Sequence, residues 1–276
     1  MGVVEIIKEA LRIARTHKSL WLFGVLVGLR FPIDFGGGGE QQPVPATPTP
    51  VELQTQLMVV LSVLALTVAY VVLKLLATGA LIEGVKRARG NGSMTVREGF
   101  REGWANWGVL FRITLLYLPL NIGSVALLVG ACYLVSLAFG ALAVFIAAGA
   151  AVLVGTPWLL TLYMWQAFAE RIAVLENRRV LDAMRKARLF LHGRLSLALK
   201  LLVAGFLGVL FVTAVGLLVI GPIAAIVVGS ARVWGIGGPA GPAALTLAPL
   251  LYVALAFVGI MVSSVWTIGY LSQVER

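Results

Sequence analysis

The chain has 276 residues, of which 60% are hydrophobic and only 12% are charged, and its mean hydropathy is +0.97. A soluble domain is nearer half apolar and a quarter charged, so the composition excludes a water-soluble fold and a disordered chain. The formal net charge is +10, and the single cysteine, Cys132, excludes an intrachain disulfide framework. The sequence therefore predicts a membrane protein.

Long apolar runs follow one another along the chain. A helix needs about 20 apolar residues to cross a bilayer core about 30 Å thick. Five runs reach this length, and a shorter first run of 13 residues rises only about 20 Å. In chain order the predicted spans are 19–31, 53–82, 108–138, 141–169, 195–230 and 243–271.

The segment 32–52 separates the first two predicted spans. It contains five prolines, four consecutive glycines and no basic residue, so it is suited neither to a helix nor to a packed core. We expect a flexible external loop here, and a receptor-binding role for this loop stays open.

Basic residues gather on one side of the predicted spans. If all six spans cross, 17 of the 22 lysines and arginines fall on the side that holds both termini, and only Arg30 and Arg232 fall on the other. The positive-inside rule then places both termini in the cytoplasm and the chain in the cell (inner) membrane as a multi-pass protein. A first segment that did not cross would leave four basic residues outside, which favours six spans.

Three short segments align without gaps: residues 9–15 (EALRIAR), 98–104 (EGFREGW) and 182–188 (DAMRKAR). They share an acid, a small residue, an apolar residue and an arginine, with a second small residue one turn after the first. Each precedes an odd-numbered span. The predicted fold class is therefore all-α: a polytopic membrane protein with six transmembrane helices in three repeats of cytoplasmic amphipathic helix, span and span. The single membrane domain, 1–276, divides into repeats at 3–90, 95–177 and 178–276.

The repeated positions supply two kinds of candidate site residue. Arg12, Arg101 and Arg185, each three residues after an acid, either pair with that acid or contact lipid phosphates. A solvated helix face that obeys the positive-inside rule is the alternative, and it stays open. The small residues at i and i+4 permit close approach of another helix, so we expect each cytoplasmic helix to dock through them. These helix-packing residues are Ala10, Ala14, Gly99, Gly103, Ala183 and Ala187. Thr95 and Asn177 are expected as helix caps.

Three cations, Lys74, Arg112 and Lys200, fall inside predicted spans. Ionisable residues within a membrane are candidates for function. All three lie in the cytoplasmic half of their spans, where snorkelling of the side chain to the interface accounts for them. The alternative is a basic vestibule that admits an anion or a lipid headgroup from the cytoplasm, with Glu83 and Glu170 as partners.

No catalytic motif occurs in the chain: HExxH, the Walker loop, GxSxG and CxxC are all absent. Neither His17 nor His192 has ligand-type residues clustered near it in the sequence. We therefore expect no enzymatic activity, no cofactor and no metal. Since the basic excess follows topology, we expect no nucleic-acid partner.

The opening EALRIARTHKSLWLFGVLVGL and the later NRRVLDAMRKARLFLHGRLSLALKLL resemble a broad prokaryotic set of uncharacterised six-helix membrane proteins. That set is similar to the membrane domain attached to some glycerophosphoryl diester phosphodiesterases. The resemblance implies the six-helix fold and carries no catalytic residues across. The soluble phosphodiesterase domain is absent from this chain, so no phosphodiesterase activity is expected.

Two functions remain open at this point. The first is a non-enzymatic module that interacts with membrane lipids, anionic headgroups above all, or with a membrane-protein partner. The alternative is a channel or transporter for an anionic or amphipathic solute with a basic cytoplasmic vestibule. A hydrated cavity lined by the three intramembrane cations would favour transport, and a close-packed centre would favour the module.

Overall fold

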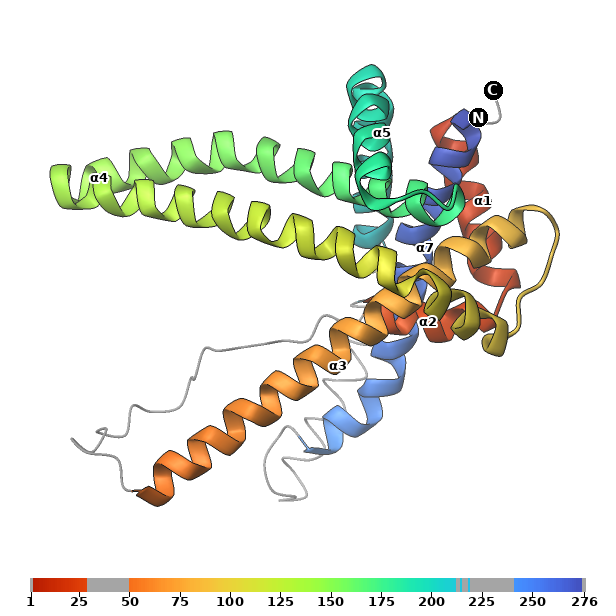
Figure 1. The fold of residues 1–276 in the computed structure, drawn as a ribbon, viewed down its shortest axis with the longest axis horizontal. Helices are drawn as coiled ribbons and strands as arrows, with labels where there is room; N and C mark the ends of the chain where they lie inside the picture. The colour runs from red at the N-terminus through yellow and green to blue at the C-terminus, as the bar shows by residue number, and fades with distance from the viewer. Residues whose placement is uncertain (1, 29–49, 212–213, 215–217, 219–240, 275–276) are drawn as a thin grey trace.

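The computed structural model describes residues 2–28, 50–211, 214, 218 and 241–274 (Figure 1). Within these ranges the chain is helical and contains no strand, which confirms the all-α prediction for this part. A helical segment, Leu195–Phe211, follows α5. The other helices are α1 (Val3–Thr16), α2 (Ser19–Gly28), α3 (Pro50–Arg89), α4 (Val96–Leu175), α5 (Val180–Gly193) and α7 (Gly241–Val274).

Helix α4 folds back on itself as an antiparallel hairpin (Figure 1). The ring of Tyr117 packs edge-on against Trp165, with ring centres 5.7 Å apart. Further along, Trp158 Nε1 donates to Ser124 Oγ at 2.9 Å. In both pairs the two residues lie equally far from residue 141 in the sequence, so the chain turns near 141, next to the break predicted at 139–140. The predicted third and fourth spans are thus the two arms of this hairpin.

Four helical stretches are long and apolar enough to cross a membrane. They are Gln56–Arg89 of α3, the first arm of α4 (Val96–Val135), its second arm (Phe145–Leu175) and Tyr252–Val274 of α7. A fifth results if α5 and the segment Leu195–Phe211, which meet at 96°, count as one broken span. Helix α2 has ten residues and rises about 15 Å, less than a bilayer core. The structure therefore fits a multi-pass membrane protein, while six spans and the threefold repeat stay predictions.

Two boundaries differ from the sequence-based expectation. The second cytoplasmic helix is not separate, because α4 begins at Val96 and continues into its first arm without a break. No proline precedes Pro119 in this stretch to interrupt the helical hydrogen bonds. Helix α3 begins at Pro50, so the last three residues of the predicted loop are helical, as suits a proline at the first helical position. Residues 32–49 of that loop lie outside the described residues.

One of the two predicted caps is confirmed. Thr95 Oγ1 accepts a hydrogen bond from the Glu98 amide at 3.3 Å, and Glu98 Oε2 accepts one from the Thr95 amide at 2.8 Å. This reciprocal pair is a capping box at the start of α4. The prediction for Asn177 is wrong, because the N-cap of α5 is Arg179.

Asn177 instead ends α4, and Asn91 ends α3 in the same way. Their φ angles are 51° and 60°, in the left-handed region that asparagine tolerates better than most residues. The amide that follows each asparagine donates to a carbonyl of the last helical turn, from Gly92 to Arg87 at 2.9 Å and from Arg178 to Ala173 at 3.2 Å. Both helix ends are therefore Schellman motifs, which turn the chain into the next helix.

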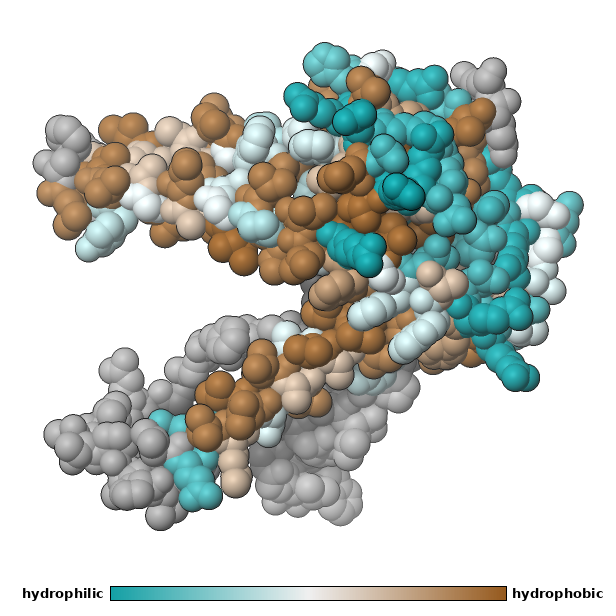
Figure 2. Space-filling model, viewed as in Figure 1, coloured by the Kyte–Doolittle hydropathy of each residue, from teal (hydrophilic) through white to brown (hydrophobic). Residues whose placement is uncertain are grey.

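The buried core lies at one end of the molecule, where α1 and α2 meet α3, α4, α5 and α7. Its largest fully buried side chains include Phe23, Tyr117, Phe168, Trp266 and Tyr270. Beyond this core the outer part of α3 and the α4 hairpin project with their apolar side chains exposed (Figure 2). Exposed apolar helices of this kind fit contact with lipid acyl chains.

Glycines permit α2 to pack directly on the backbone of α7. An ideal Cβ on Gly24 would lie 2.3 Å from the Ala256 carbonyl oxygen, and one on Gly28 would lie 2.2 Å from that of Leu255. From the other side, a Cβ on Gly259 would lie 2.2 Å from the Gly24 carbonyl oxygen. Gly24 and Gly28 form a GxxxG pattern, the type of small-residue face through which membrane helices associate.

We expect Gly24→Ala to lower the thermal midpoint of the protein in detergent. One added methyl group meets a backbone carbonyl, and such overpacking costs about 1–3 kcal/mol. The matched control is Gly123→Ala. A Cβ there meets nothing within 4 Å, so this substitution only replaces glycine with a residue of higher helix propensity. Thermal unfolding followed by size-exclusion chromatography measures both variants. Equal midpoints for the two would contradict close α2–α7 packing.

Candidate functional site

The six predicted helix-packing residues are all buried. Gly103 makes the closest approach, because an ideal Cβ there would lie 2.4 Å from the Leu76 carbonyl oxygen of α3. At Gly99 an ideal Cβ would lie 2.5 Å from the ring of Phe23 on α2. The start of α4 therefore lies against two other helices through its glycine face. Ala10, Ala14, Ala183 and Ala187 are likewise fully buried in the core.

The three predicted lipid-contact arginines lie on exposed helix surfaces. Arg12 Nη2 is 3.9 Å from Glu9 Oε1, so it forms the predicted pair with the acid three residues earlier. Arg101 pairs instead with Glu102 at 3.6 Å, because Glu98 is engaged in the capping box. Arg185 forms no ion pair within the described part of the chain.

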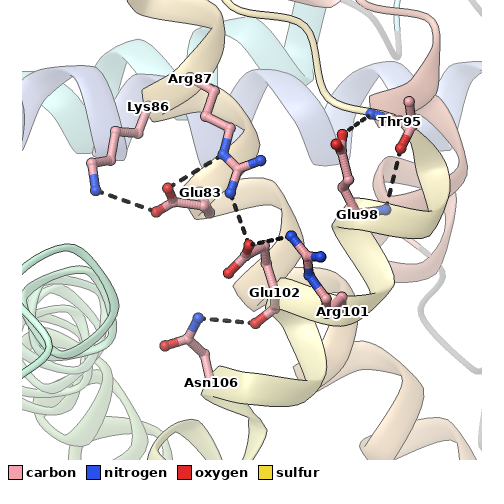
Figure 3. Close-up of polar contacts among 8 residues, drawn as sticks. All are labelled: Glu83, Lys86, Arg87, Thr95, Glu98, Arg101, Glu102 and Asn106. Atoms are coloured by element: carbon pink, nitrogen blue, oxygen red, sulfur yellow. Dashed lines mark hydrogen bonds and ion pairs between the residues drawn. The ribbon is translucent and has the colours of Figure 1, made fainter.

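Charged side chains tie the end of α3 to the start of α4 (Figure 3). Arg87 Nη2 lies 2.8 Å from Glu102 Oε1, and its Nε lies 3.5 Å from Glu83 Oε1. Lys86 adds a 3.5 Å contact to the other oxygen of Glu83. A further bridge joins α3 to α1, where Arg89 Nε lies 3.6 Å from Glu9 Oε1.

Glu176 joins three parts of the fold at the end of α4. Lys186 Nζ of α5 donates to both carboxylate oxygens at 2.6 Å, and Arg178 Nε donates at 2.7 Å. The hydroxyl of Tyr270 on α7 donates to the same carboxylate. Burial raises the pKa of Glu176, but hydrogen bonds from Lys186, Tyr270 and Arg178 outweigh it, so the pKa lies below its ordinary value.

Carboxylates and cations at this end of the molecule differ in exposure. The side chains of Glu9, Glu83, Glu102 and Glu176 are only 15–24% exposed. By contrast, the side chains of Arg12 and Arg101 are 58% and 75% exposed. These four acids are thus shielded among the helices, while Glu5 and Asp182 are exposed, and the exposed cations outnumber the exposed acids on this surface. We name the region of α1, the end of α3 from Glu83, the start of α4 and α5 the polar end; its hydrophilic surface is visible in Figure 2.

Within the described chain, the five residues predicted to line a vestibule form no hydrogen bond or ion pair with one another. Lys74 lies over the ring of Tyr70, and Glu170 accepts a hydrogen bond from Gln166. Arg112, on the first arm of α4, and Lys200 are exposed, and Glu83 is held in ion pairs. Two hollows on the described surface, of about 270 and 480 Å³, lie along α1 and are lined by none of these five residues. In the same part of the chain no three His, Cys, Asp or Glu side chains cluster closely enough to hold a metal ion.

Sequence reasoning missed Arg171, which it assigned to a cytoplasmic loop. In the structure Arg171 is 5% exposed near the end of α4. Its Nη1 donates to the Ala167 carbonyl at 2.6 Å, and its guanidinium lies 6.0 Å from the centre of the Trp266 ring on α7. The sequence signal that could have indicated a buried Arg171 was its position directly after Glu170, at the end of an apolar run. Which face of the helix meets α7 is decided by tertiary packing.

We expect Gly103→Leu to destabilise the protein and Gly108→Leu to be tolerated. The two glycines lie five residues apart on α4, but a Cβ at Gly108 meets nothing within 4 Å. A side chain at 103 must push α4 away from α3, so the midpoint should fall by several degrees, at about 2–4 °C per kcal/mol. Thermal unfolding in detergent compares the two variants. If Gly108→Leu lowered the midpoint and Gly103→Leu did not, close packing of Gly103 against α3 would be contradicted.

The Glu176 cluster predicts a pH-dependent stability. Because its pKa is lowered on folding, the ionised carboxylate stabilises the fold above the ordinary glutamate value of about 4.3, and this contribution disappears as the pH falls through the folded value. Glu176→Gln should therefore cost about 1–3 kcal/mol at pH 7, and progressively less as the pH falls below the ordinary glutamate value toward pH 3. Thermal midpoints over this pH range test it, with the exposed Asp182→Asn as control. A difference in thermal midpoint between the wild type and Glu176→Gln that does not change with pH would contradict the prediction.

Comparison with known proteins adds no assignment: no family model, no curated protein and no solved structure matches the chain. The resemblance to the membrane domain of glycerophosphoryl diester phosphodiesterases therefore stays a prediction. Function has to be argued from the residues of this chain, among which the polar end offers the most chemistry.

Proposed function

We propose that the protein is a non-enzymatic membrane module that binds anionic lipid headgroups at its polar end. The observation that carries the proposal is the separation of charge at that end, where shielded carboxylates hold the helices together and the cations extend outward. Anionic headgroups attract such cations by about 1 kcal/mol for each basic residue near the surface.

Helix α1 is amphipathic and turns its basic side away from the protein. Its apolar side chains, Ile6 and Ile13 among them, are buried against the rest of the protein. On its outer side, Lys8, Arg12 and Arg15 line a hollow of about 270 Å³. Lys8 and Arg12 also line the neighbouring hollow of about 480 Å³ together with Glu5 and Glu9, so cations outnumber acids along this side of α1.

The proposal includes an orientation. The apolar arms of α3 and α4 lie in the bilayer, and the polar end, with both termini, lies at the cytoplasmic surface of the cell (inner) membrane. The excess of basic residues at that end supports this orientation through the positive-inside rule. A membrane-protein partner that carries an acidic surface is the other ligand this charge suits.

The test uses the triple variant Arg12→Gln, Arg101→Gln and Arg185→Gln. We expect the purified wild-type protein to retain phosphatidylglycerol, and the triple variant to bind it more weakly by about fivefold for each arginine. Native mass spectrometry with titrated lipid measures the affinity. The matched control replaces the same arginines with lysine, which keeps the charge and should keep most of the binding.

Two results would contradict the proposal. One is equal retention of phosphatidylglycerol by the glutamine and lysine variants. The other is selective anion flux through liposomes that contain the wild-type protein, because flux would favour the channel or transporter alternative. Surface binding should also weaken at high salt, since salt screens exposed charges.

A further inference from the structure

Three aromatic rings stack along one side of the first α4 arm. The ring centres of Trp104 and Trp107 lie 6.2 Å apart with 14° between their planes, and those of Trp107 and Phe111 lie 5.4 Å apart with 17° between theirs. The side chain of Trp104 is 68% exposed and that of Phe111 is 38% exposed. We name these three residues the aromatic ladder. A contiguous group of exposed aromatic rings marks an interaction surface.

The aromatic ladder lies where one face of α4 changes from charged to aliphatic. In the turns before the ladder this face carries Arg97 and Arg101, both exposed. In the turns after it the same face carries exposed aliphatic side chains, which are Leu115, Leu118, Ile122 and Val129. These positions recur every three or four residues, the spacing of one helical face. The same change, from a hydrophilic end to hydrophobic arms, is visible in Figure 2.

The aliphatic part of this face has the length of a bilayer core. Residues 113–132 contain no charged residue, and a helix of this length rises about 30 Å. Arg112 comes directly before this stretch, and Tyr133, 63% exposed, comes directly after it on the same helix face. Tryptophan and tyrosine are enriched at both surfaces of a bilayer because an apolar ring carries one polar group. Aromatic side chains therefore stand at both ends of a stretch that spans the core.

Helix α3 crosses α4 at the level of the aromatic ladder. An ideal Cβ at Gly103 would lie 2.4 Å from the Leu76 carbonyl oxygen, so the two backbones are in close contact there. Residues at a point of contact lie at one depth, whichever way the membrane normal runs. Trp104 follows this point by one residue on α4, and Lys74 precedes it by two residues on α3. Trp104 and Lys74 thus mark one level on two helices.

On α3 the apolar part also ends at this level. Residues 53–73 contain no charged residue, and most of their described apolar side chains are exposed. Lys74 comes next, and its Nζ lies 5.9 Å from the centre of the Tyr70 ring. A lysine paired with an aromatic ring suits the bilayer interface. Helix α3 therefore supports the same boundary independently of α4.

We infer that the aromatic ladder anchors the first α4 arm in the cytoplasmic interface of the bilayer, at the level of the lipid glycerol and ester groups, with residues 113–132 in the acyl core. The inference rests on the placement of the α4 hairpin in the bilayer that the proposed function includes. It adds a contact that does not depend on lipid charge. An acidic partner protein would complement Arg97 and Arg101 but would leave the aliphatic stretch without a partner, so the bilayer is the occupant that matches the whole face.

Arg112 fits this placement without a vestibule. It directly follows Phe111, and side chains of a helix lean toward the N-terminus of that helix, which for the first α4 arm is the polar end. Snorkelling along this direction brings the guanidinium to the headgroup level. The position of Arg112 at the edge of the uncharged stretch is then that of an interfacial cation.

The experiment measures the depth of single nitroxide labels in phosphatidylcholine nanodiscs at about 0.5 M salt, where exposed charges are strongly screened. Cys132→Ala removes the only cysteine of the chain, and one new cysteine is then introduced as Arg101→Cys, Gly108→Cys, Gly123→Cys or Gly130→Cys. A Cβ at each of these three glycines meets nothing within 4 Å, so the label is accommodated. Accessibility to oxygen and to a water-soluble nickel chelate, measured by EPR, gives the depth.

We expect the label at 101 to be accessible to the nickel chelate and the label at 108 to lie at the edge of the acyl core. The label at 123, in the middle of the uncharged stretch, should be deepest, about 15 Å from either edge of the core. The label at 130 should be shallower again. This order of depths follows from the placement of residues 113–132.

A second comparison tests the aromatic ladder itself. Trp104→Leu replaces an interfacial side chain with one that prefers the acyl core, so the label at 108 should move deeper by about 3 Å, the rise of two residues. Trp104→Tyr keeps an interfacial ring and should preserve the depth. The control Leu127→Ala truncates a side chain that is 71% exposed within the aliphatic stretch, and it should also leave the depth unchanged.

Three results would overturn the inference: equal depths at 108 and 123, access of the nickel chelate to the label at 123, or no change in depth for Trp104→Leu. The test is separate from that of the proposed function, because phosphatidylcholine carries no net charge. The expected depths together with unchanged phosphatidylglycerol binding by the arginine variants would support the inference and contradict charge-dependent binding alone. Loss of phosphatidylglycerol binding with a different depth profile would overturn the inference alone.

Discussion

Close approach of helix backbones is the constraint on which the rest of this structure depends. Apolar side chains gain little from leaving lipid for another helix, so membrane helices associate where small residues bring backbones together. Here Gly24 lies against the Ala256 carbonyl of α7, and Gly103 lies against the Leu76 carbonyl of α3. These contacts gather the helices at one end of the molecule. The apolar side chains of α3 and α4 beyond that end are left exposed, as suits helices that cross a membrane.

The same convergence decides what the charged residues do. Because the helix ends lie close together, Glu9, Glu102 and Glu176 each reach a cation on a neighbouring helix, which shields the acids and leaves cations at the surface. A single ion pair such as Glu9–Arg89 adds little stability, so its main consequence is the positive surface it leaves, whereas the Glu176 carboxylate gathers three donors. Glu170 lies outside this arrangement, because the side chain that donates to it is Gln166 of the same helix.

Much of the helical layout follows from the amino-acid sequence. The apolar run 53–82 became α3 with modest extension, the break at 139–140 became the turn of a hairpin, and Thr95 became a cap. These features depend on local chemistry: apolar length, backbone hydrogen bonding and a hydroxyl before a helix. The errors arose where local signals compete. Asn177 suits both a helix start and a left-handed helix end, and the geometry of α4 decided between them.

By itself the sequence determined that this chain is a helical membrane protein, that its positive charge is concentrated on one side, and which small residues were suited to helix contacts. Only the tertiary structure decided which carboxylate meets which cation, that Arg171 is buried against Trp266, and that Glu176 collects donors from α5 and α7. The physical reason is the range of each effect. Helix formation and hydropathy depend on neighbours within a few turns, whereas these pairings join helices separated by up to about a hundred residues and depend on how the helices pack.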